Sequence, residues 1–285
     1  MKPLETVAIV GVGLIGGSIG LALRERKLAK KVIGVGRRAS SLTKAKRCGC
    51  VTSTTTSLAR GVAKAELVIV CTPIELIADQ VREIAEVCAD ECLITDTGST
   101  KGAIVRRLES KWGGGDQRGV TFVGSHPLAG GEKGGPDMAV ADLFQDRPAI
   151  VTPSHCTPKE AQHQIQQFWT ALGSQVTVMS VEEHDRVVAA ISHLPHLVAA
   201  ALAGATSVDD LPLTSTGFAD TTRIAAGDVD LWQQIFLDNR RHILQALAQF
   251  ERLLSNYRKA LKADDAQALT QLLEQAKNHR DAVGS

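Results

Sequence analysis

The side chain best placed to do acid–base chemistry is His126. It is the only histidine in the first 150 residues, and it follows an apolar segment, residues 121–124, that has the composition of a β-strand. Imidazole changes its charge near neutral pH, so a histidine at the exit of a strand predicts a general base. A structural histidine is the alternative, and the residues alone leave both open.

Two more histidines and an arginine form a second group of candidates. His193 and His196 lie three residues apart, on neighbouring positions of a predicted helix that Pro195 interrupts. Such a pair could be half of a metal site, but no cysteine or carboxylate cluster accompanies it. Contact with a substrate or simple packing is therefore favoured, and no metal is expected. Further along, Arg223 could bind a carboxylate, with Asp220 nearby.

A glycine-rich turn near the start of the chain predicts a dinucleotide site. Gly11, Gly13 and Gly16 follow a short apolar strand and open a helix that begins with Leu14 and Ile15. The first glycine permits the tight turn, the second lets a pyrophosphate approach the backbone, and the third lets helix and strand pack closely. The helix N-terminus then faces the phosphates. The alternative, a glycine-rich turn without a ligand, is disfavoured because this turn lies directly between a strand and a helix.

The end of the next strand predicts which dinucleotide binds. NAD-binding domains carry an acidic residue here, which bonds the ribose 2′-hydroxyl. Gly36 takes that place, and Arg37, Arg38 and Ser40 follow it. A guanidinium can hold a 2′-phosphate with two hydrogen bonds. The alternative is that the two arginines are only solvent-exposed side chains at the end of a strand. We therefore expect NADP to be preferred, with NAD as a second cofactor.

Three further motifs follow predicted strands, where open α/β sheets bind their ligands. Thr72 and Pro73 come directly after one strand and are expected to contact the cofactor. The run Asp-Thr-Gly-Ser-Thr-Lys starts at Asp96, and the run Ser-His-Pro-Leu-Ala-Gly-Gly-Glu starts at Ser125. These motifs should meet at one edge of the sheet.

Strand-like and helix-like segments alternate through the first part of the chain. Several predicted strands are continuous apolar runs, typical of a parallel sheet covered on both faces. They cover residues 6–10, 32–35, 67–71, 93–96, 121–124, 149–152 and 176–179. Helices are predicted between most of them, as at 75–89 and 101–112, and a glycine-rich surface loop at 112–119. Residues 1–181 are thus predicted to form a doubly wound, Rossmann-type α/β domain that binds the dinucleotide.

Residues 182–285 are predicted to form an all-helical domain. Ser180 with Glu183 makes a capping box that starts its first helix, and Asp230 and Asp264 are expected to open two more. The broad apolar face of the first helix consists of Val187, Val188, Ile191, Leu194, Leu197, Val198, Ala201 and Leu202. One thin layer of helices cannot bury so much apolar surface. We therefore expect this domain to form a homodimer as well as to bind the substrate.

The composition excludes several classes of protein. The 285 residues carry 32 basic and 31 acidic side chains, a net charge of +1, which predicts no nucleic-acid or membrane partner. The longest apolar stretch, residues 197–205, is far shorter than a membrane span, and the first strand leaves no room for a signal peptide. The six cysteines form no C-x-x-C pair, which favours free thiols. We therefore expect a cytoplasmic protein with a small-molecule substrate.

Several motifs follow one another in a specific order along nearly the whole chain. They are Gly-Val-Gly-Leu-Ile-Gly-Gly-Ser from Gly11, the runs from Asp96 and Ser125, His184-Asp185, Ser-His-Leu-Pro-His from Ser192, Phe-Ala-Asp-Thr-Thr-Arg from Phe218, and Trp232. Each motif alone is modest evidence for a family, but all of them in this order are highly specific evidence. The series resembles the prephenate/arogenate dehydrogenase family of tyrosine biosynthesis. The resemblance implies a Rossmann domain joined to a helical dimerisation domain.

The resemblance also implies an oxidative decarboxylation. His126 would take the proton of the ring hydroxyl while a hydride leaves the same carbon for the nicotinamide, and the ring carboxylate would leave as carbon dioxide. Ser99 would help fix the hydroxyl or the nicotinamide. The product would be 4-hydroxyphenylpyruvate from prephenate or tyrosine from arogenate. Because a neutral imidazole is required, the activity is expected to fall on acidification.

The same resemblance implies how the substrate is held. His196 resembles a substrate-binding histidine, and Arg223 resembles the residue that holds a substrate carboxylate. Glu132 resembles an acidic gate over the site. Asp185 and Trp232 match positions that shape the pocket.

Two other functions compete with this interpretation. A two-domain hydroxyacid dehydrogenase would need a catalytic lysine on the helical domain, and there is no lysine between Lys159 and Lys259. A non-catalytic dinucleotide-sensing module would not need His126, His196 and Arg223 together. A turnover assay with prephenate and arogenate separates the three, whereas the sequence leaves open which of the two substrates is used and whether tyrosine inhibits.

Overall fold

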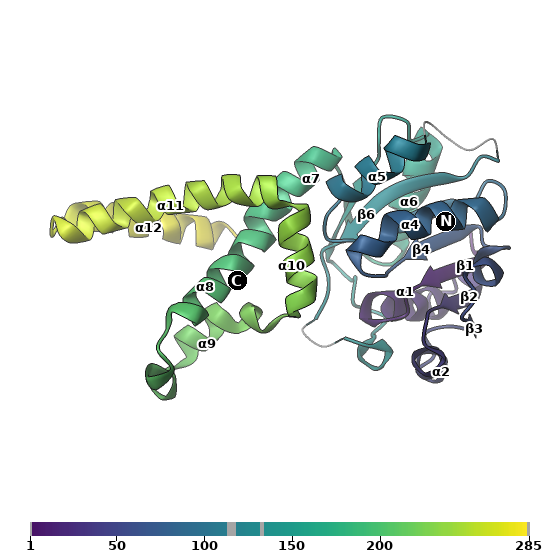
Figure 1. Ribbon diagram of the computed structural model, residues 1–285, viewed down its shortest axis with the longest axis horizontal. Helices are drawn as coiled ribbons and strands as arrows, with labels where there is room; N and C mark the ends of the chain where they lie inside the picture. The colour runs from purple at the N-terminus through teal and green to yellow at the C-terminus, as the bar shows by residue number, and fades with distance from the viewer. Residues whose placement is uncertain (1, 113–117, 132–133, 284–285) are drawn as a thin grey trace. The chain divides into compact units, whose positions relative to one another are not determined.

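The computed structural model describes residues 2–112, 118–131 and 134–283. The chain forms two compact units, Met1–Asn239 and Arg240–Ser285, and each is described by itself. The first unit holds a sheet with helices on both faces and further helices after it, and the second is a helical hairpin (Figure 1). Glu132 and most of the predicted surface loop at 112–119 lie outside the described residues.

An eight-stranded sheet forms the centre of the first unit. Its strands are β1 Leu4–Val10, β2 Ala29–Val35, β3 Ser53–Thr55, β4 Leu67–Val70, β5 Leu93–Asp96, β6 Thr121–Pro127, β7 Pro148–Thr152 and β8 Gln175–Val178. They lie in the order β3-β2-β1-β4-β5-β6-β7-β8, so the direction of winding reverses between β1 and β4. Such a reversal is where doubly wound sheets bind their ligands.

Helices cover both faces of this sheet. They are α1 Leu14–Glu25, α2 Ala39–Arg47, α3 Leu58–Val62, α4 Ile74–Val87, α5 Gly102–Trp112 and α6 Lys159–Ala171. On one face, α1 and α6 bury side chains such as Ile19 and Trp169 against the strands, and both are fully buried. Each buried aliphatic side chain contributes about 1.5–3 kcal/mol to folding. The continuous apolar runs of the central strands are explained by this two-sided covering.

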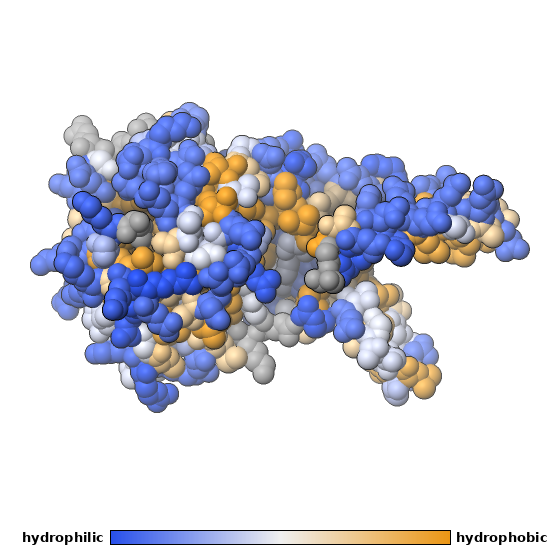
Figure 2. Space-filling model, turned by 180° about the vertical axis from the view of Figure 1, so that it is seen from behind, coloured by the Kyte–Doolittle hydropathy of each residue, from blue (hydrophilic) through white to orange (hydrophobic). Residues whose placement is uncertain are grey.

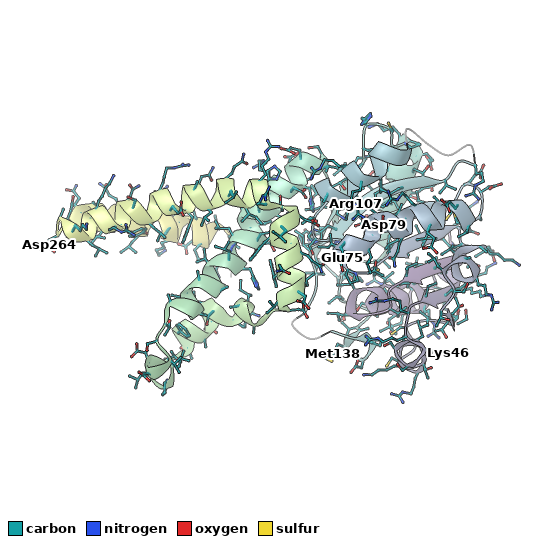
Figure 3. The ribbon with its side chains drawn as sticks, viewed as in Figure 1. Lys46, Glu75, Asp79, Arg107, Met138 and Asp264 are labelled. Carbon is teal, nitrogen blue, oxygen red and sulfur yellow. The ribbon has the colours of Figure 1, made fainter. Side chains whose placement is uncertain are left out.

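Helices α4 and α5 cover the opposite face and are tied to each other. Ile77 and Val81 of α4, one turn apart, are fully buried in the second core cluster. Arg107 of α5 reaches across to α4, where it donates to the Asp79 carboxylate at 2.8 Å and to the Glu75 carbonyl oxygen at 3.0 Å (Figure 3). These two hydrogen bonds tie the middle of α5 to the beginning of α4.

Two features of the sheet differ from the prediction. Strand β7 pairs antiparallel with β6. The described part of their connection holds a short 3₁₀ turn, η1 (Pro136–Met138), and not the crossover helix that usually joins parallel strands. Strand β3 was not predicted, since its Ser-Thr-Thr sequence contains no apolar residue and it lies at the edge of the sheet beside β2. The remaining strands are confirmed to within three residues of each predicted end.

A series of helices completes the first unit. It consists of α7 Val181–Val188, the π-helical turn η2 Ala189–His193, α8 Leu194–Ala205, the 3₁₀ turn η3 Val208–Leu213, α9 Thr216–Thr222, the 3₁₀ turn η4 Arg223–Ala226 and α10 Val229–Asp238. The cap at Ser180 is confirmed, because its Oγ accepts from the Glu183 amide at 3.1 Å. The predicted cap at Asp230 is wrong. Asp228 caps α10 instead by accepting from the Leu231 amide at 2.9 Å.

The continuous helical segment Val181–Ala205 leaves part of its predicted apolar face on the surface. Its buried side carries His184 and His193, whereas Ile191 of the predicted apolar face is 60% exposed. Apolar side chains remain on the surface of the helical segments in Figure 2. By length and composition alone, this is the one helix in the described ranges that could cross a membrane. The buried residues of this helix include His184, Asp185 and His193, which are hydrogen-bonded within the protein, together with Val188.

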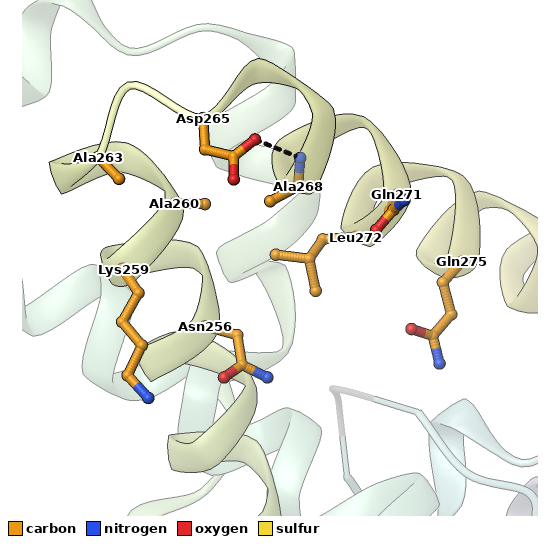
Figure 4. Close-up of a pocket in the computed structure, with 9 residues that line it drawn as sticks. All are labelled: Asn256, Lys259, Ala260, Ala263, Asp265, Ala268, Gln271, Leu272 and Gln275. Carbon is orange, nitrogen blue, oxygen red and sulfur yellow. Dashed lines mark hydrogen bonds between the residues drawn. The ribbon is translucent and has the colours of Figure 1, made fainter.

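The second unit consists of α11 (Arg240–Lys262) and α12 (Ala266–Ala282). The predicted start at Asp264 is wrong by one residue: Asp264 lies in the turn with φ of +52°, and Asp265 caps α12 through the Ala268 amide at 2.9 Å. A groove of about 470 Å³ between the two helices is shown in Figure 4. It is lined by Asn256, Lys259, Ala260, Ala263, Asp265, Ala268, Gln271, Leu272 and Gln275. None of the predicted site residues lines this groove.

Candidate active site

The turn between β1 and α1 has the geometry of a phosphate-binding loop. Gly11 has φ of +92°, and a Cβ at Gly16 would lie 2.1 Å from the Gly11 carbonyl oxygen, so neither position accepts a side chain. At Gly13, the N-cap of α1, a Cβ would meet no atom within 4 Å. Leu14 and Ile15 begin the helix, and Ile15 packs on the core. The open space beside the N-terminus of α1 fits a dinucleotide phosphate.

The other predicted cofactor residues lie at the same edge of the sheet. The last residues of β2 and β4 pair with the last residue of β1, so the segments after these strands are neighbours. Arg37, Arg38 and Ser40 are exposed where β2 leads into α2. Thr72 and Pro73 lie between β4 and α4, and Pro73 is the N-cap of α4. The structure therefore brings these residues around the glycine-rich turn.

A buried ion pair fixes the loop after β5. Lys101 Nζ donates to Asp96 Oδ2, and both side chains are 0% exposed. The Asp96 carboxylate also accepts from the backbone amides of Gly98 at 2.9 Å and Ser125 at 3.0 Å. These contacts join the ends of β5 and β6, since Ser125 belongs to β6. Ser99 is half-buried in the same loop.

His126 stands near the end of β6 and is joined to the helices by a chain of hydrogen bonds. Its Nδ1 lies 2.9 Å from Nε2 of His184 on α7. The His184 Nδ1 in turn lies 2.8 Å from Oδ1 of Asp185. The Asp185 carboxylate accepts from the backbone amides of Lys101 at 2.9 Å and Gly102 at 2.8 Å. The chain thus runs from the N-terminus of α5 to the His126 ring.

The surroundings of His126 keep its ring neutral. Burial, followed by the neighbouring His184, Lys101 and His193 side chains, holds the pKa of His126 well below the ordinary value of 6.5. The residue is 8% exposed, and its Nε2 bonds to no other residue in the described ranges. A neutral imidazole with one unbonded nitrogen can accept a proton.

His193 and His196 are both buried beside this chain. Asn239 Nδ2 donates to the Asp185 carbonyl oxygen at 2.7 Å and to Nδ1 of His193 at 3.1 Å. The His196 ring stacks on Trp232, with ring centroids 3.5 Å apart and planes at 13°. Burial lowers the pKa of both histidines, that of His193 to about 4, so both rings are neutral at neutral pH. The His196 Nδ1 is buried without a hydrogen-bond partner among the residues that the structure describes.

Arg223 and Asp220 lie at the surface of α9 and η4. The η4 turn packs against α8 and is followed by Gly227. A Cβ at Gly227 would lie 2.6 Å from Nε1 of Trp232 and 3.1 Å from Cε1 of His196. The turn that begins with Arg223 therefore ends directly against the stacked ring pair.

Sequence reasoning missed two residues that hold the site together. His184 matches a motif but was given no role, and Asn239 was not considered at all. An adjacent His-Asp pair in the first turns of a helix was the one signal for His184, and Asn239 offered none. No group of three or more His, Cys, Asp or Glu side chains in the described ranges is arranged to hold a metal ion.

The glycine-rich turn and His126 lie at the same edge of the sheet, because β1, β4, β5 and β6 run parallel. A dinucleotide cradle and a neutral histidine at the carboxyl ends of parallel strands define an NAD(P)-dependent oxidoreductase of the Rossmann class. The family model described as "Prephenate dehydrogenase, nucleotide-binding domain" matches residues 19–178, and "Prephenate dehydrogenase, dimerization domain" matches residues 180–275. The chain belongs to the prephenate dehydrogenase family.

Individual relatives agree with this assignment. The prephenate dehydrogenase of Bacillus subtilis is 35% identical over 98% of this chain and 76% of that protein. The crystal structure of the A. aeolicus prephenate dehydrogenase with hydroxyphenyl propionate and NAD+ has a TM-score of 0.89 and 31% identity, covering 98% of both chains. The structure of the Synechocystis arogenate dehydrogenase has a TM-score of 0.82 and 30% identity, covering 98% of this chain and 100% of that one.

Proposed function

We propose that this protein catalyses the NAD(P)-dependent oxidative decarboxylation of prephenate or arogenate, a step in tyrosine formation. The observation that supports this most directly is the buried, neutral His126 at the end of β6, at the same edge of the sheet as the glycine-rich turn. Relatives named for prephenate and for arogenate support the substrate class.

In this proposal, His126 is the general base and Ser99 orients the reacting hydroxyl. The neutral imidazole takes the proton of the ring hydroxyl as the C–O bond becomes a carbonyl. The glycine-rich turn at Gly11, Gly13 and Gly16 would hold the dinucleotide, which would supply the acceptor for the hydride that leaves the same carbon. The ring carboxylate leaves as carbon dioxide, its bonding electrons stay in the ring, and the resulting aromatic phenol makes the step strongly favourable.

The helical part supplies the substrate contacts. We assign His196 to the substrate, and its buried Nδ1 has no hydrogen-bond partner among the described residues. The neutral His193 is held by a hydrogen bond from Asn239. Arg223 binds a substrate carboxylate, because a guanidinium pairs with two carboxylate oxygens at once. Asp220 lies on the same surface, and Glu132 is assigned to the approach to the site.

A turnover assay tests the proposal. The full chain is incubated with prephenate or arogenate and with NAD+ or NADP+, and the reduced dinucleotide is followed by absorbance while the aromatic product is identified by chromatography. We expect turnover with at least one substrate, with one carbon dioxide released per dinucleotide reduced. Absence of turnover with every combination would refute the proposal. Reduction of the dinucleotide without carbon dioxide release would indicate a hydroxyacid dehydrogenase instead.

The preferred cofactor is NADP. No acidic side chain follows β2 at the position that would bond a ribose 2′-hydroxyl, and Gly36 stands there. The exposed Arg37 and Arg38 next to it are available to a 2′-phosphate. NAD remains a second cofactor, since both dinucleotides share the pyrophosphate that the glycine-rich turn binds.

The proposed domain organisation is supported by the two family models, which match residues 19–178 and 180–275. Residues 1–181 bind the dinucleotide, and residues 182–285 bind the substrate and form a homodimer. Apolar side chains left on the surface of this region, such as Ile191 (60% exposed) and Leu213 (84% exposed), support the dimer. We assign the protein to the cytoplasm, with no nucleic-acid or membrane partner.

A further inference from the structure

The hydrogen-bonded chain that ends at His126 begins with a carboxylate that can only accept. The backbone amides of Lys101 and Gly102 donate to Asp185 at the N-terminus of α5, where the helix dipole favours a negative charge. A Cβ at Gly102 would lie 2.6 Å from Asp185 Oδ2, so only glycine lets the carboxylate come this close. Burial raises the pKa of Asp185, but the hydrogen bonds from His184 and these amides outweigh it and lower the pKa. Asp185 is therefore ionised.

The ionised carboxylate decides the tautomer of His184. Because Asp185 Oδ1 only accepts, the His184 Nδ1 at 2.8 Å must carry a proton and donate it. Burial lowers the pKa of His184, so its ring is neutral and carries one N–H. The His184 Nε2 is then an unprotonated acceptor.

The tautomer of His184 decides that of His126. With an acceptor 2.9 Å away, the His126 Nδ1 must be the protonated nitrogen. Because the His126 ring is also neutral, its Nε2 carries the lone pair. The charged and titratable groups around both rings are Lys101, Asp96 and His193, together with Asp185 itself. None of these groups forms a hydrogen bond with a ring nitrogen of His126. The hydrogen bonds from Asp185 through His184 to His126 therefore decide which ring nitrogens are protonated.

We propose that His184 and Asp185 are positioning residues that hold His126 in the one tautomer able to act as the base, with Nε2 unprotonated. This inference rests on the proposed function of His126. During the reaction the substrate proton binds to Nε2, while the Nδ1 proton stays between His126 and His184 and the next proton stays between His184 and Asp185. No proton moves to Asp185. Its negative charge stabilises the imidazolium that forms at His126.

The first test measures the tautomer without any turnover. In ¹⁵N-histidine-labelled wild-type protein with bound NADP+, long-range ¹H–¹⁵N spectra separate protonated from unprotonated ring nitrogens. The His126 signals are identified by their loss in His126→Asn. We expect a protonated Nδ1 and an unprotonated Nε2 at neutral pH. The opposite tautomer, or an even mixture of the two, would overturn the inference even if the enzyme is active.

The second test separates positioning from simple structural support. His184→Leu removes the acceptor for His126, whereas His184→Gln keeps an oxygen, Oε1, close to the position of Nε2. We expect His184→Leu to lose about 10–100-fold in kcat, the usual cost of losing a partner that orients a functional histidine, with KM and NADP+ affinity little changed. His184→Gln should recover most of that loss.

Each outcome of these tests decides one point. Equal losses in both His184 variants, accompanied by a lower melting temperature and weaker NADP+ binding, would show structural support and overturn the inference. An unchanged kcat in His184→Leu would also overturn the inference. If the wild-type protein turned over neither substrate, the proposed function would fail, and the tautomer measurement alone would decide the arrangement of protons.

Discussion

Replacing His126 with asparagine is the most informative single perturbation. The asparagine Nδ2 lies near the position of the imidazole Nδ1 and can still donate to His184 Nε2, so the hydrogen-bonded chain is kept. What is lost is the second ring nitrogen, which we assign as the base. Because the glycine-rich turn is formed by other strands, binding of the dinucleotide should be unchanged. The expected loss is therefore one of chemistry, not of folding.

The magnitude follows from what the base supplies. A positioned general base contributes about 10²–10⁴-fold, which corresponds to about 3–5 kcal/mol of the activation barrier. His126 can contribute fully at neutral pH, because even a pKa of 6.5 leaves about three quarters of an imidazole neutral at pH 7 and a lower pKa leaves more. We therefore expect His126→Asn to lower kcat by about 10²–10⁴-fold.

The pH profile gives an independent check. Protonation of His126 removes the lone pair, so the wild-type kcat/KM should fall as the pH drops below the pKa of that residue. Because burial and the neighbouring groups lower this pKa, the fall should be centred below pH 6.5. The variant should lack this acid limb.

The assay is steady-state turnover between pH 4.5 and 8.5, with thermal unfolding and dinucleotide binding measured in parallel. His163→Asn, an exposed histidine on α6, is the matched control and should behave as wild type. The reasoning fails if His126→Asn turns over within a few-fold of wild type, if it keeps the acid limb, or if the wild-type limb is centred above pH 6.5.

Four further outcomes are expected. Gly16→Ala should lose dinucleotide binding and about 1–3 kcal/mol of stability, because its Cβ would lie 2.1 Å from a backbone oxygen. Gly13→Ala should weaken dinucleotide binding with an unchanged melting temperature, and equal melting temperatures of the two variants in calorimetry would contradict this. Lys101→Met leaves the buried Asp96 carboxylate without its cation and should lower the free energy of unfolding in urea by about 3–5 kcal/mol. A loss under about 1 kcal/mol would argue against a stabilising role of this ion pair. Arg37→Ala should weaken the affinity for NADP+ by at least about tenfold and leave the affinity for NAD+ unchanged, as measured by titration calorimetry. Arg47→Ala, at the far end of α2, is the control, and equal losses of affinity for both dinucleotides in Arg37→Ala would count against the assignment. Light scattering at micromolar concentration should give the mass of a dimer, and a monomer would exclude the proposed interface.

The cofactor half of the site could be predicted from local sequence. The strand before Gly11, the spacing of the three glycines and the helix after them all lie close together along the chain. Gly11 and Gly16 have steric reasons within the protein, and Gly13 leaves open space that a phosphate can occupy. The cap at Ser180 could also be predicted from local sequence, because the hydrogen bond joins residues three apart. Periodicity also predicted the central strands, since residues buried on both faces must be apolar.

The sequence by itself also marked His126 as the base, through its position after a strand and through the family resemblance. Only the tertiary structure shows which groups contact it. His126 and His184 are 58 residues apart, and Asn239 bonds Asp185 across 54 residues, so no local spacing connects them. The helix after Ser180 illustrates the same limit. Hydropathy marked its apolar face, but only the structure shows that His184, Asp185 and His193 are buried, because their hydrogen-bond partners lie on β6, on α5 and at Asn239. A buried polar group is stable only when distant parts of the chain supply those partners, and the fold alone determines where they meet.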